Sequence, residues 1–172
     1  EVIVRLSKII SVILHPIFMP IIALYLSLEL IPNIGFSITN YLNFIFLTLF
    51  FSTIILPLIS ILFLIKYKLV SSLEMNFHKE RSVPLLITVT WMIYGYYKLL
   101  SVIVLAPILK AEITGAIIIV FIAAAISKYW KISLHILAIG GVVGVFFSLN
   151  FLFGSLLQII AMSILFSGIL GI

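Results

Sequence analysis

Residues 41–65 read YLNFIFLTLFFSTIILPLISILFLI, a run that contains no charged side chain. A helix needs about 20 predominantly apolar residues to cross the hydrocarbon core of a bilayer, and this stretch is longer than that. It ends at Lys66, where a charged loop begins. The stretch therefore predicts a transmembrane helix.

The overall composition agrees with a membrane location. Of the 172 residues, 65% are apolar and 9% are charged, with a mean hydropathy of +1.44. Ordinary soluble domains are roughly 45–50% apolar and about 25% charged. A soluble domain of about 150 residues still exposes about 30% of its chain surface, so this much apolar surface could not be hidden from water. The composition excludes a soluble enzyme, a disordered chain and a nucleic-acid partner.

Long apolar runs separated by charges and prolines predict an all-α fold, an integral membrane bundle of about six transmembrane helices. We expect a single transmembrane helical domain over residues 1–172, truncated at its C-terminus because the chain ends inside an apolar run. The third span is expected to open at Pro84, since proline suits the first turn of a helix. The predicted spans cover about residues 9–31, 41–65, 84–106, 113–127, 132–149 and 153–172.

Basic residues gather on one side of this six-span arrangement. The net charge is +5, and only Lys98 and Lys110 fall elsewhere. Because Lys and Arg are enriched in cytoplasmic loops, the basic side is predicted to be cytoplasmic. The orientation stays open if these cations serve a phosphate site instead. The eight residues on the basic side are Arg5, Lys8, Lys66, Lys68, Lys79, Arg81, Lys128 and Lys131.

Two short segments on the basic side carry side chains that suit phosphate chemistry. Residues 78–84 read HKERSVP, before the third span, and residues 131–135 read KISLH, before the fifth. Lys131 and His135 are four residues apart and so share one face of a helix. We expect both segments to meet at one membrane face and to bring together Lys79, Arg81, Lys131, Ser133 and His135.

The residue types define what such a site would bind. A guanidinium offers a rigid fork that matches phosphate oxygens, and a lysine adds a point charge. A histidine side chain titrates near neutral pH and can protonate a leaving alkoxide. The pattern predicts a site for an anionic, phosphate-bearing lipid. His15 in the first span and His78 are further candidates, placed around the phosphate and not on it.

A simpler interpretation stands beside this one. Cations at span ends commonly anchor the topology or contact lipid headgroups, which is our expectation for Lys66, Lys68 and Lys128. An intramembrane histidine is often a packing residue. Gly140, Gly144 and Ser148 form a stripe of small side chains that favours close helix packing and predicts a central place for the fifth span.

The chain resembles the type 2 phosphatidic acid phosphatase superfamily, as a divergent small integral-membrane branch. The first family motif is a Lys, six residues, then Arg-Pro. Arg81 matches the Arg, Pro84 follows two places late, and Glu74 occupies the Lys position, for which Lys79 is a substitute. The resemblance also covers the six-span layout.

The second family motif is Pro-Ser-Gly-His, and here Ser133 and His135 match while Ile132 and Leu134 replace the other two residues. The third motif is Ser-Arg, five residues, His, three residues and Asp, and this chain has no match for it. The missing histidine is the nucleophile of the family, which forms a phosphohistidine intermediate.

The resemblance implies a lipid-phosphate phosphatase that hydrolyses a phosphate or diphosphate ester by a metal-independent histidine mechanism, without a cofactor. Arg81 would hold the phosphate, Ser133 would hydrogen-bond to it and His135 would protonate the leaving group. The 172-residue chain itself is expected to be inactive, because no residue matches the nucleophile. The implied location is a bacterial inner membrane, and the implied partners are a phosphate-bearing lipid and the bilayer.

Two alternatives to a phosphatase remain open. The first is a non-catalytic membrane subunit that binds or transports an anionic lipid or another anion. The second is a structural subunit whose cations only set the topology. The sequence leaves the oligomeric state open.

Overall fold

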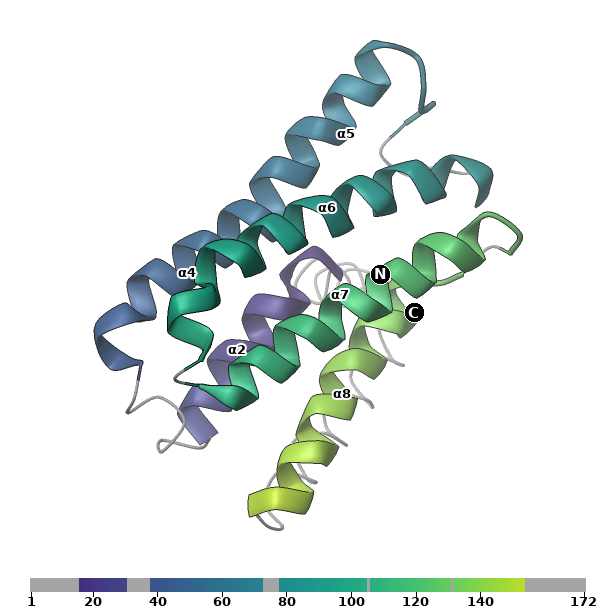
Figure 1. The fold of residues 1–172 in the computed structure, drawn as a ribbon. Helices are drawn as coiled ribbons and strands as arrows, with labels where there is room; N and C mark the ends of the chain where they lie inside the picture. The colour runs from purple at the N-terminus through teal and green to yellow at the C-terminus, as the bar shows by residue number, and fades with distance from the viewer. Residues whose placement is uncertain (1–15, 31–37, 73–77, 105, 131, 154–172) are drawn as a thin grey trace, which may run out of the picture. The chain divides into compact units, whose positions relative to one another are not determined.

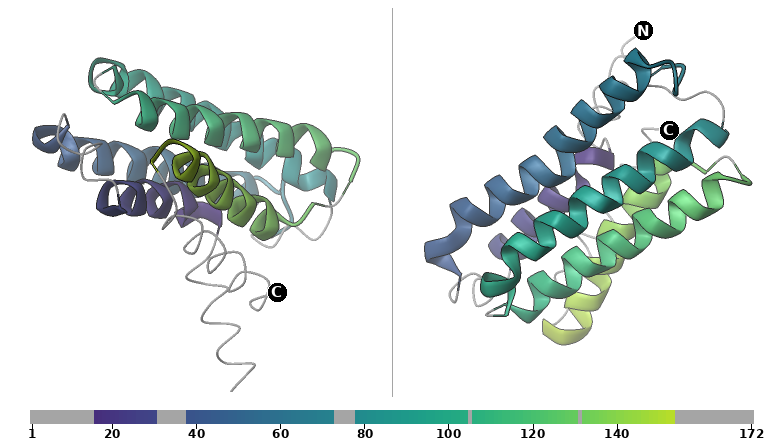
Figure 2. Two further views of the ribbon diagram at one scale, coloured as in Figure 1. Left: turned by 90° about the horizontal axis from the view of Figure 1, so that it is seen from below. Right: turned by 45° about the horizontal axis from the view of Figure 1, so that its top comes forward.

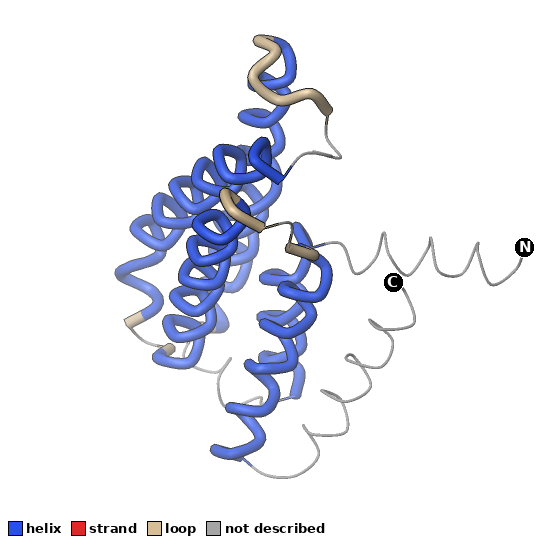
Figure 3. Tube along the Cα trace, turned by 90° about the vertical axis from the view of Figure 1, so that its right-hand side faces the viewer, coloured by secondary structure: helices blue, strands red, loops and turns tan. Residues whose placement is uncertain are grey.

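The computed structural model describes residues 16–30, 38–72, 78–104, 106–130 and 132–153. Of these residues 88% are helical and none lies in a strand, which confirms the all-α prediction (Figure 3). The chain divides into two compact units. The central unit is Asn33–Ile132, and the terminal unit combines Glu1–Pro32 with Ser133–Ile172.

The central unit consists of three long helical stretches (Figure 1). The first is continuous from η2 (Thr39–Tyr41) through α4 (Leu42–Phe50) and η3 (Phe51–Ile55) to α5 (Leu56–Lys66). It is followed by α6 (His78–Ile103) and α7 (Pro107–Ser127). Within its described residues, the terminal unit contains η1 (Pro16–Phe18), α2 (Met19–Leu30) and α8 (Leu134–Phe153).

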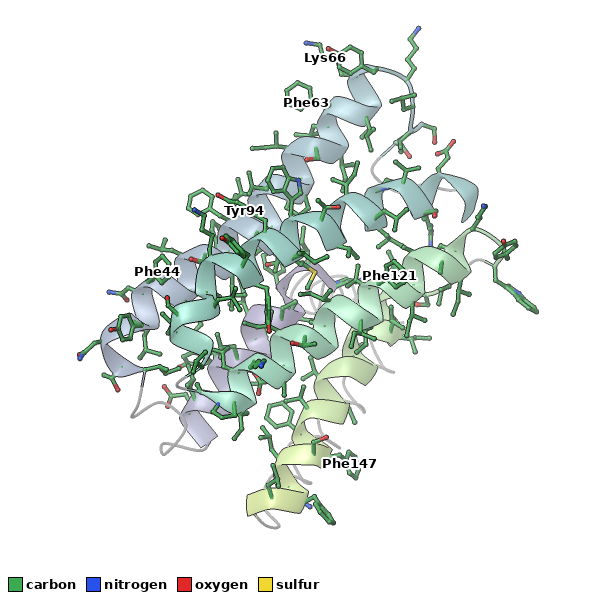
Figure 4. All side chains as sticks on the ribbon, in the orientation of Figure 1. Phe44, Phe63, Lys66, Tyr94, Phe121 and Phe147 are labelled. Carbon is green, nitrogen blue, oxygen red and sulfur yellow. The ribbon has the colours of Figure 1, made fainter. Side chains whose placement is uncertain are left out.

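Four of the described helices are long and apolar enough to cross a membrane, so this is a multi-pass membrane protein. A helix of 21 residues is about 32 Å long, close to the thickness of the bilayer core. Large apolar side chains such as Phe44, Phe63 and Phe121 point outward, where lipid would contact them (Figure 4). The four segments are Thr39–Lys66, Glu80–Val102, Pro107–Ser127 and Leu134–Leu152.

The predicted number of six spans is only partly tested. Of the first predicted span, the described part is the short apolar helix Pro16–Glu29. The sixth, 153–172, lies outside the described residues apart from Phe153. The full count therefore stays a prediction.

Two predicted helix boundaries were wrong. The helix α6 begins at His78, so Pro84 lies inside it and not in its first turn. The proline removes only one backbone hydrogen bond near the helix start, and Glu80 in the first turn favours the helix because it carries a negative charge at the positive end of the dipole. The helix α7 begins at Pro107, not near residue 113, because proline suits that first position.

The central unit is organised around α6, which packs against α7 on one side and against the 39–66 stretch on the other (Figure 2). The buried side chains of this unit are mostly aliphatic. They include Leu49, Ile54, Val89, Met92, Leu99, Val102, Leu109 and Ile113.

A π-helical turn separates α4 from α5, and Pro57 explains it. In a regular helix the ring of Pro57 would clash with the carbonyl of Thr53. The wider turn, in which the Leu56 N–H donates to the Phe51 carbonyl, relieves this clash. The hydroxyls of Ser52 and Thr53 both donate to the Leu49 carbonyl, at 3.3 and 2.8 Å, and so remain satisfied although they are buried.

The π-helical turn contacts α6 at Gly95. A Cβ atom on Gly95 would lie 2.7 Å from the Ser52 Cβ, closer than real side chains approach. One turn earlier on α6, the Trp91 Nε1 donates to the Ser60 hydroxyl at 2.9 Å. Gly95 therefore sets the distance between α6 and the 39–66 stretch.

In the terminal unit, α2 packs against α8. The buried side chains of these two helices include Ala23 and Leu24 on α2 and Val142 and Phe146 on α8. The small-residue stripe lies on another face of α8. Nothing lies within 4 Å of a Cβ placed on Gly140 or Gly144. The close packing predicted for this stripe is therefore not found among the described residues.

We expect Gly95→Ala to destabilise the protein by about 1–3 kcal/mol, because the added methyl group would force α6 away from Ser52. Gly115→Ala on α7 is the matched control, since nothing lies within 4 Å of its Cβ position. The control should be neutral or more stable by up to about 1 kcal/mol. Thermal unfolding in detergent measures both, and equal midpoints for the two variants would contradict the assigned contact.

Candidate functional site

The cations of the central unit concentrate at one end, here called the basic end. Because α6 runs antiparallel to α5 and α7, the end of α5, the start of α6 and the end of α7 lie there (Figure 1). Lys66 marks the end of α5 in Figure 4. Among the described residues, the cations of the basic end are Lys66, Lys68, Lys79, Arg81 and Lys128.

Arg81 makes a long-range contact at this end. It lies in the first turns of α6, partly buried, and its Nη1 donates to the Ile132 carbonyl at 3.0 Å. Ile132 is the last residue of the central unit, and the chain continues from it directly into Ser133 and His135. Arg81 therefore holds the connection after α7 to the start of α6, a role that the sequence did not reveal.

The neighbouring residue, Ser82, ties α6 to α7. Its hydroxyl donates to the Ala124 carbonyl at 3.0 Å, and Ala123 and Ala124 are fully buried. Small side chains let two helices approach closely enough for such a bond, as is common in membranes. The run Ala123-Ala124-Ala125 is the signal that could have identified this contact from the sequence.

Glu80 fastens the loop that precedes α6. Its Oε2 accepts hydrogen bonds from the Ser71 hydroxyl at 2.6 Å and from the Ser71 backbone N–H at 3.2 Å. A carboxylate in the first turn also interacts favourably with the helix dipole. The Glu80 carboxylate at the basic end therefore binds the protein's own loop at Ser71.

Ser133 caps the start of α8 in the terminal unit. Its hydroxyl accepts a long hydrogen bond of 3.5 Å from the Ile136 N–H, and its carbonyl accepts one of 3.1 Å from Leu137. Serine is a favoured residue at this position because it satisfies a backbone donor of the first turn. His135 lies in that first turn, half-buried.

The remaining predicted site residues are only partly described. His15 and Lys131 lie outside the described residues. His78 and Lys79 lie in the first turn of α6, and their side chains are not described. The convergence of Arg81, Lys131 and His135 on one phosphate therefore stays a prediction. In the described part of the chain, no group of three or more His, Asp or Glu residues is arranged to hold a metal ion.

Comparisons of the chain with protein-family models, with curated proteins and with solved structures gave no match.

Arg81→Ala should destabilise the protein by about 1.5–3 kcal/mol, the usual value of a hydrogen bond to a charged group. It should also speed proteolysis of the connection between α7 and α8, because the Ile132 carbonyl loses its donor. Lys128→Ala at the same end is the control and should change stability by less than about 0.5 kcal/mol. Thermal unfolding and limited proteolysis in detergent test this, and a proteolysis rate equal to that of the control would refute the anchoring role.

Ser133→Ala should cost about 0.5–1 kcal/mol through loss of the α8 cap. Ser133→Asp should retain the stability, because aspartate caps equally well and its charge suits a helix N-terminus. Helix content and thermal unfolding of the two variants provide the measurement. If both variants unfold at the same temperature, Ser133 is not the cap.

Proposed function

We propose that the protein binds the phosphate-bearing headgroup of a membrane lipid with Arg81, Lys131, Ser133 and His135, and that Lys79 adds a further cation. The observation that carries the proposal is the bond from Arg81 to Ile132, the residue directly before Ser133. It connects the first basic segment with the beginning of the second, which are far apart in the sequence.

The chemistry of these residues supports phosphate recognition. A guanidinium has five N–H donors and can hold a carbonyl and phosphate oxygens at the same time. Ser133 and His135 belong to the start of α8, and helix N-termini favour anions because their backbone N–H groups and dipole point toward them. A lipid phosphate at the membrane surface would reach such groups without entering the hydrocarbon core.

Hydrolysis of the bound ester is the second candidate function, supported by the resemblance of Arg81, Ser133 and His135 to lipid phosphatases. In that reaction a nucleophile attacks phosphorus, the lipid oxygen leaves with a proton from His135, and water then releases inorganic phosphate. The bond broken is the phosphorus–oxygen ester bond, and the products are a lipid alcohol and phosphate. Binding is the leading proposal because no residue of this chain matches the family's nucleophilic histidine.

The proposed location is a bacterial inner membrane, with the basic end on the cytoplasmic side. The distribution of cations supports this orientation, since the described residues at the basic end of the central unit include five cations. Sidedness can be measured directly, because the natural chain contains no cysteine and single-cysteine variants can be labelled from either side.

The test compares the affinity of the protein for phosphatidic acid, a phosphate monoester lipid, with its affinity for phosphatidylcholine, both in detergent. His135→Asn and Lys131→Gln should each weaken binding of phosphatidic acid roughly 10- to 100-fold, the loss expected for a charge-assisted hydrogen bond of about 1.5–3 kcal/mol. Ser133→Asp should weaken it as well, by charge repulsion, although the fold is retained. Lys98→Gln, at the opposite end of α6, is the control.

Release of inorganic phosphate, measured in parallel, separates the two candidates. Binding without release supports recognition alone. Release that His135→Asn abolishes supports hydrolysis. Equal affinity for phosphatidic acid and phosphatidylcholine would contradict both.

A further inference from the structure

The basic end carries a second set of side chains that the proposed phosphate site does not use. Each of two helix ends presents lysine next to aromatic residues, and we call these six residues the basic collar. They are Lys66, Tyr67 and Lys68 at the end of α5, and Lys128, Tyr129 and Trp130 directly after α7. All six are exposed, and Tyr67, Tyr129 and Trp130 are exposed to 70%, 77% and 77%.

The backbone holds the α5 part of the collar in a defined turn. The Tyr67 N–H donates to the Phe63 carbonyl at 3.0 Å, and the Leu69 N–H donates to the Leu64 carbonyl at 2.9 Å. Lys68, between them, has a φ of 58°, the left-handed conformation that commonly ends a helix. The aromatic and cationic side chains are therefore carried on an ordered helix end.

The α7 part is held in the same way. The N–H groups of Tyr129 and Trp130 both donate to the Ile126 carbonyl, at 2.9 and 2.8 Å. The Lys128 Nζ lies 5.9 Å from the centre of the Tyr129 ring, within cation–π range. Lysine and aromatic side chains thus lie next to each other at both helix ends.

The other end of the central unit differs in charge. Among its described residues the cations are Lys98 and Lys110, and α7 carries Glu112 close to Lys110. The Lys98 Nζ lies 5.5 Å from the centre of the Tyr94 ring on its own helix. Among the described residues of the unit, positive charge is therefore concentrated at the basic end.

We propose that the basic collar lies in the headgroup layer of the membrane and concentrates anionic phospholipids around the protein. Tyrosine and tryptophan prefer this layer because their rings are apolar while their tips are polar. Lysines near a membrane surface attract anionic lipids, and the attraction weakens with salt. The partner is an anionic phosphodiester lipid surface, and the inference does not depend on the phosphate site.

Trp130 provides the readout, because the chain has only one other tryptophan, Trp91. In the Trp91→Phe background, the protein is reconstituted in phosphatidylcholine vesicles with a small fraction of brominated phosphatidylglycerol or, separately, brominated phosphatidylcholine. The bromine is placed high on the acyl chain, so that it quenches fluorescence near the headgroup layer. We expect phosphatidylglycerol to quench Trp130 more strongly than phosphatidylcholine at equal fraction, and added salt to reduce the difference.

Replacing Lys66, Lys68 and Lys128 together by Gln should remove this preference. Each lost lysine should reduce the enrichment of phosphatidylglycerol near the protein by about fivefold. Lys98→Gln with Lys110→Gln is the matched control and should leave the preference intact. Equal quenching by the two lipids in the parent protein would overturn the proposal, as would a preference that survives the triple replacement. Absence of quenching by either lipid would place Trp130 outside the bilayer and would also overturn it.

Failure of this inference is distinguishable from failure of the proposed function. The phosphate site is tested by a preference for a phosphate monoester over phosphatidylcholine and by His135→Asn. The collar is tested by a phosphodiester lipid and by lysines outside that site. Either result can be positive while the other is negative.

Discussion

The close approach of α6 to the helices on both its sides is the contact on which the central unit depends. Helices in a bilayer gain little from burying apolar surface, because lipid is as apolar as leucine, so packing and hydrogen bonds decide their association. Small residues make this packing possible here. Gly95 lets the π-helical turn approach α6 at Ser52. On the opposite side, Ala123 and Ala124 let α7 approach α6 at Ser82.

The same packing organises the basic end. Three consecutive residues at the start of α6 bind three different parts of the unit: Glu80 the preceding loop, Arg81 the connection after α7, and Ser82 the helix α7 itself. Arg81, which the sequence suggests as a phosphate ligand, therefore also holds backbone in place, and Glu80 does the same for the preceding loop. Any lipid headgroup bound at this end meets residues whose positions the protein has already defined.

The two proposed lipid contacts differ in physical character. The proposed phosphate site would rely on directed hydrogen bonds from a few side chains, which select a particular group. The basic collar relies on charge and on interfacial aromatic rings at the exposed ends of α5 and α7, which select only a type of surface. One protein can use both, since the second brings anionic lipid to the region where the first would bind it.

The sequence by itself determined the membrane class, the all-α fold and the approximate place of the four spanning helices, because hydropathy depends on local composition alone. It misplaced the start of α6, which continues upstream of Pro84 with Glu80 in its first turn, and the start of α7, where Pro107 takes the first helical position. It proposed Arg81, Ser133 and His135 as site residues by residue type, but it did not reveal the bonds of Arg81 to Ile132 or of Ser133 to α8. Only the tertiary structure decided the contacts Arg81–Ile132, Ser82–Ala124 and Trp91–Ser60, because each joins residues more than 30 positions apart through helix packing that no local pattern encodes.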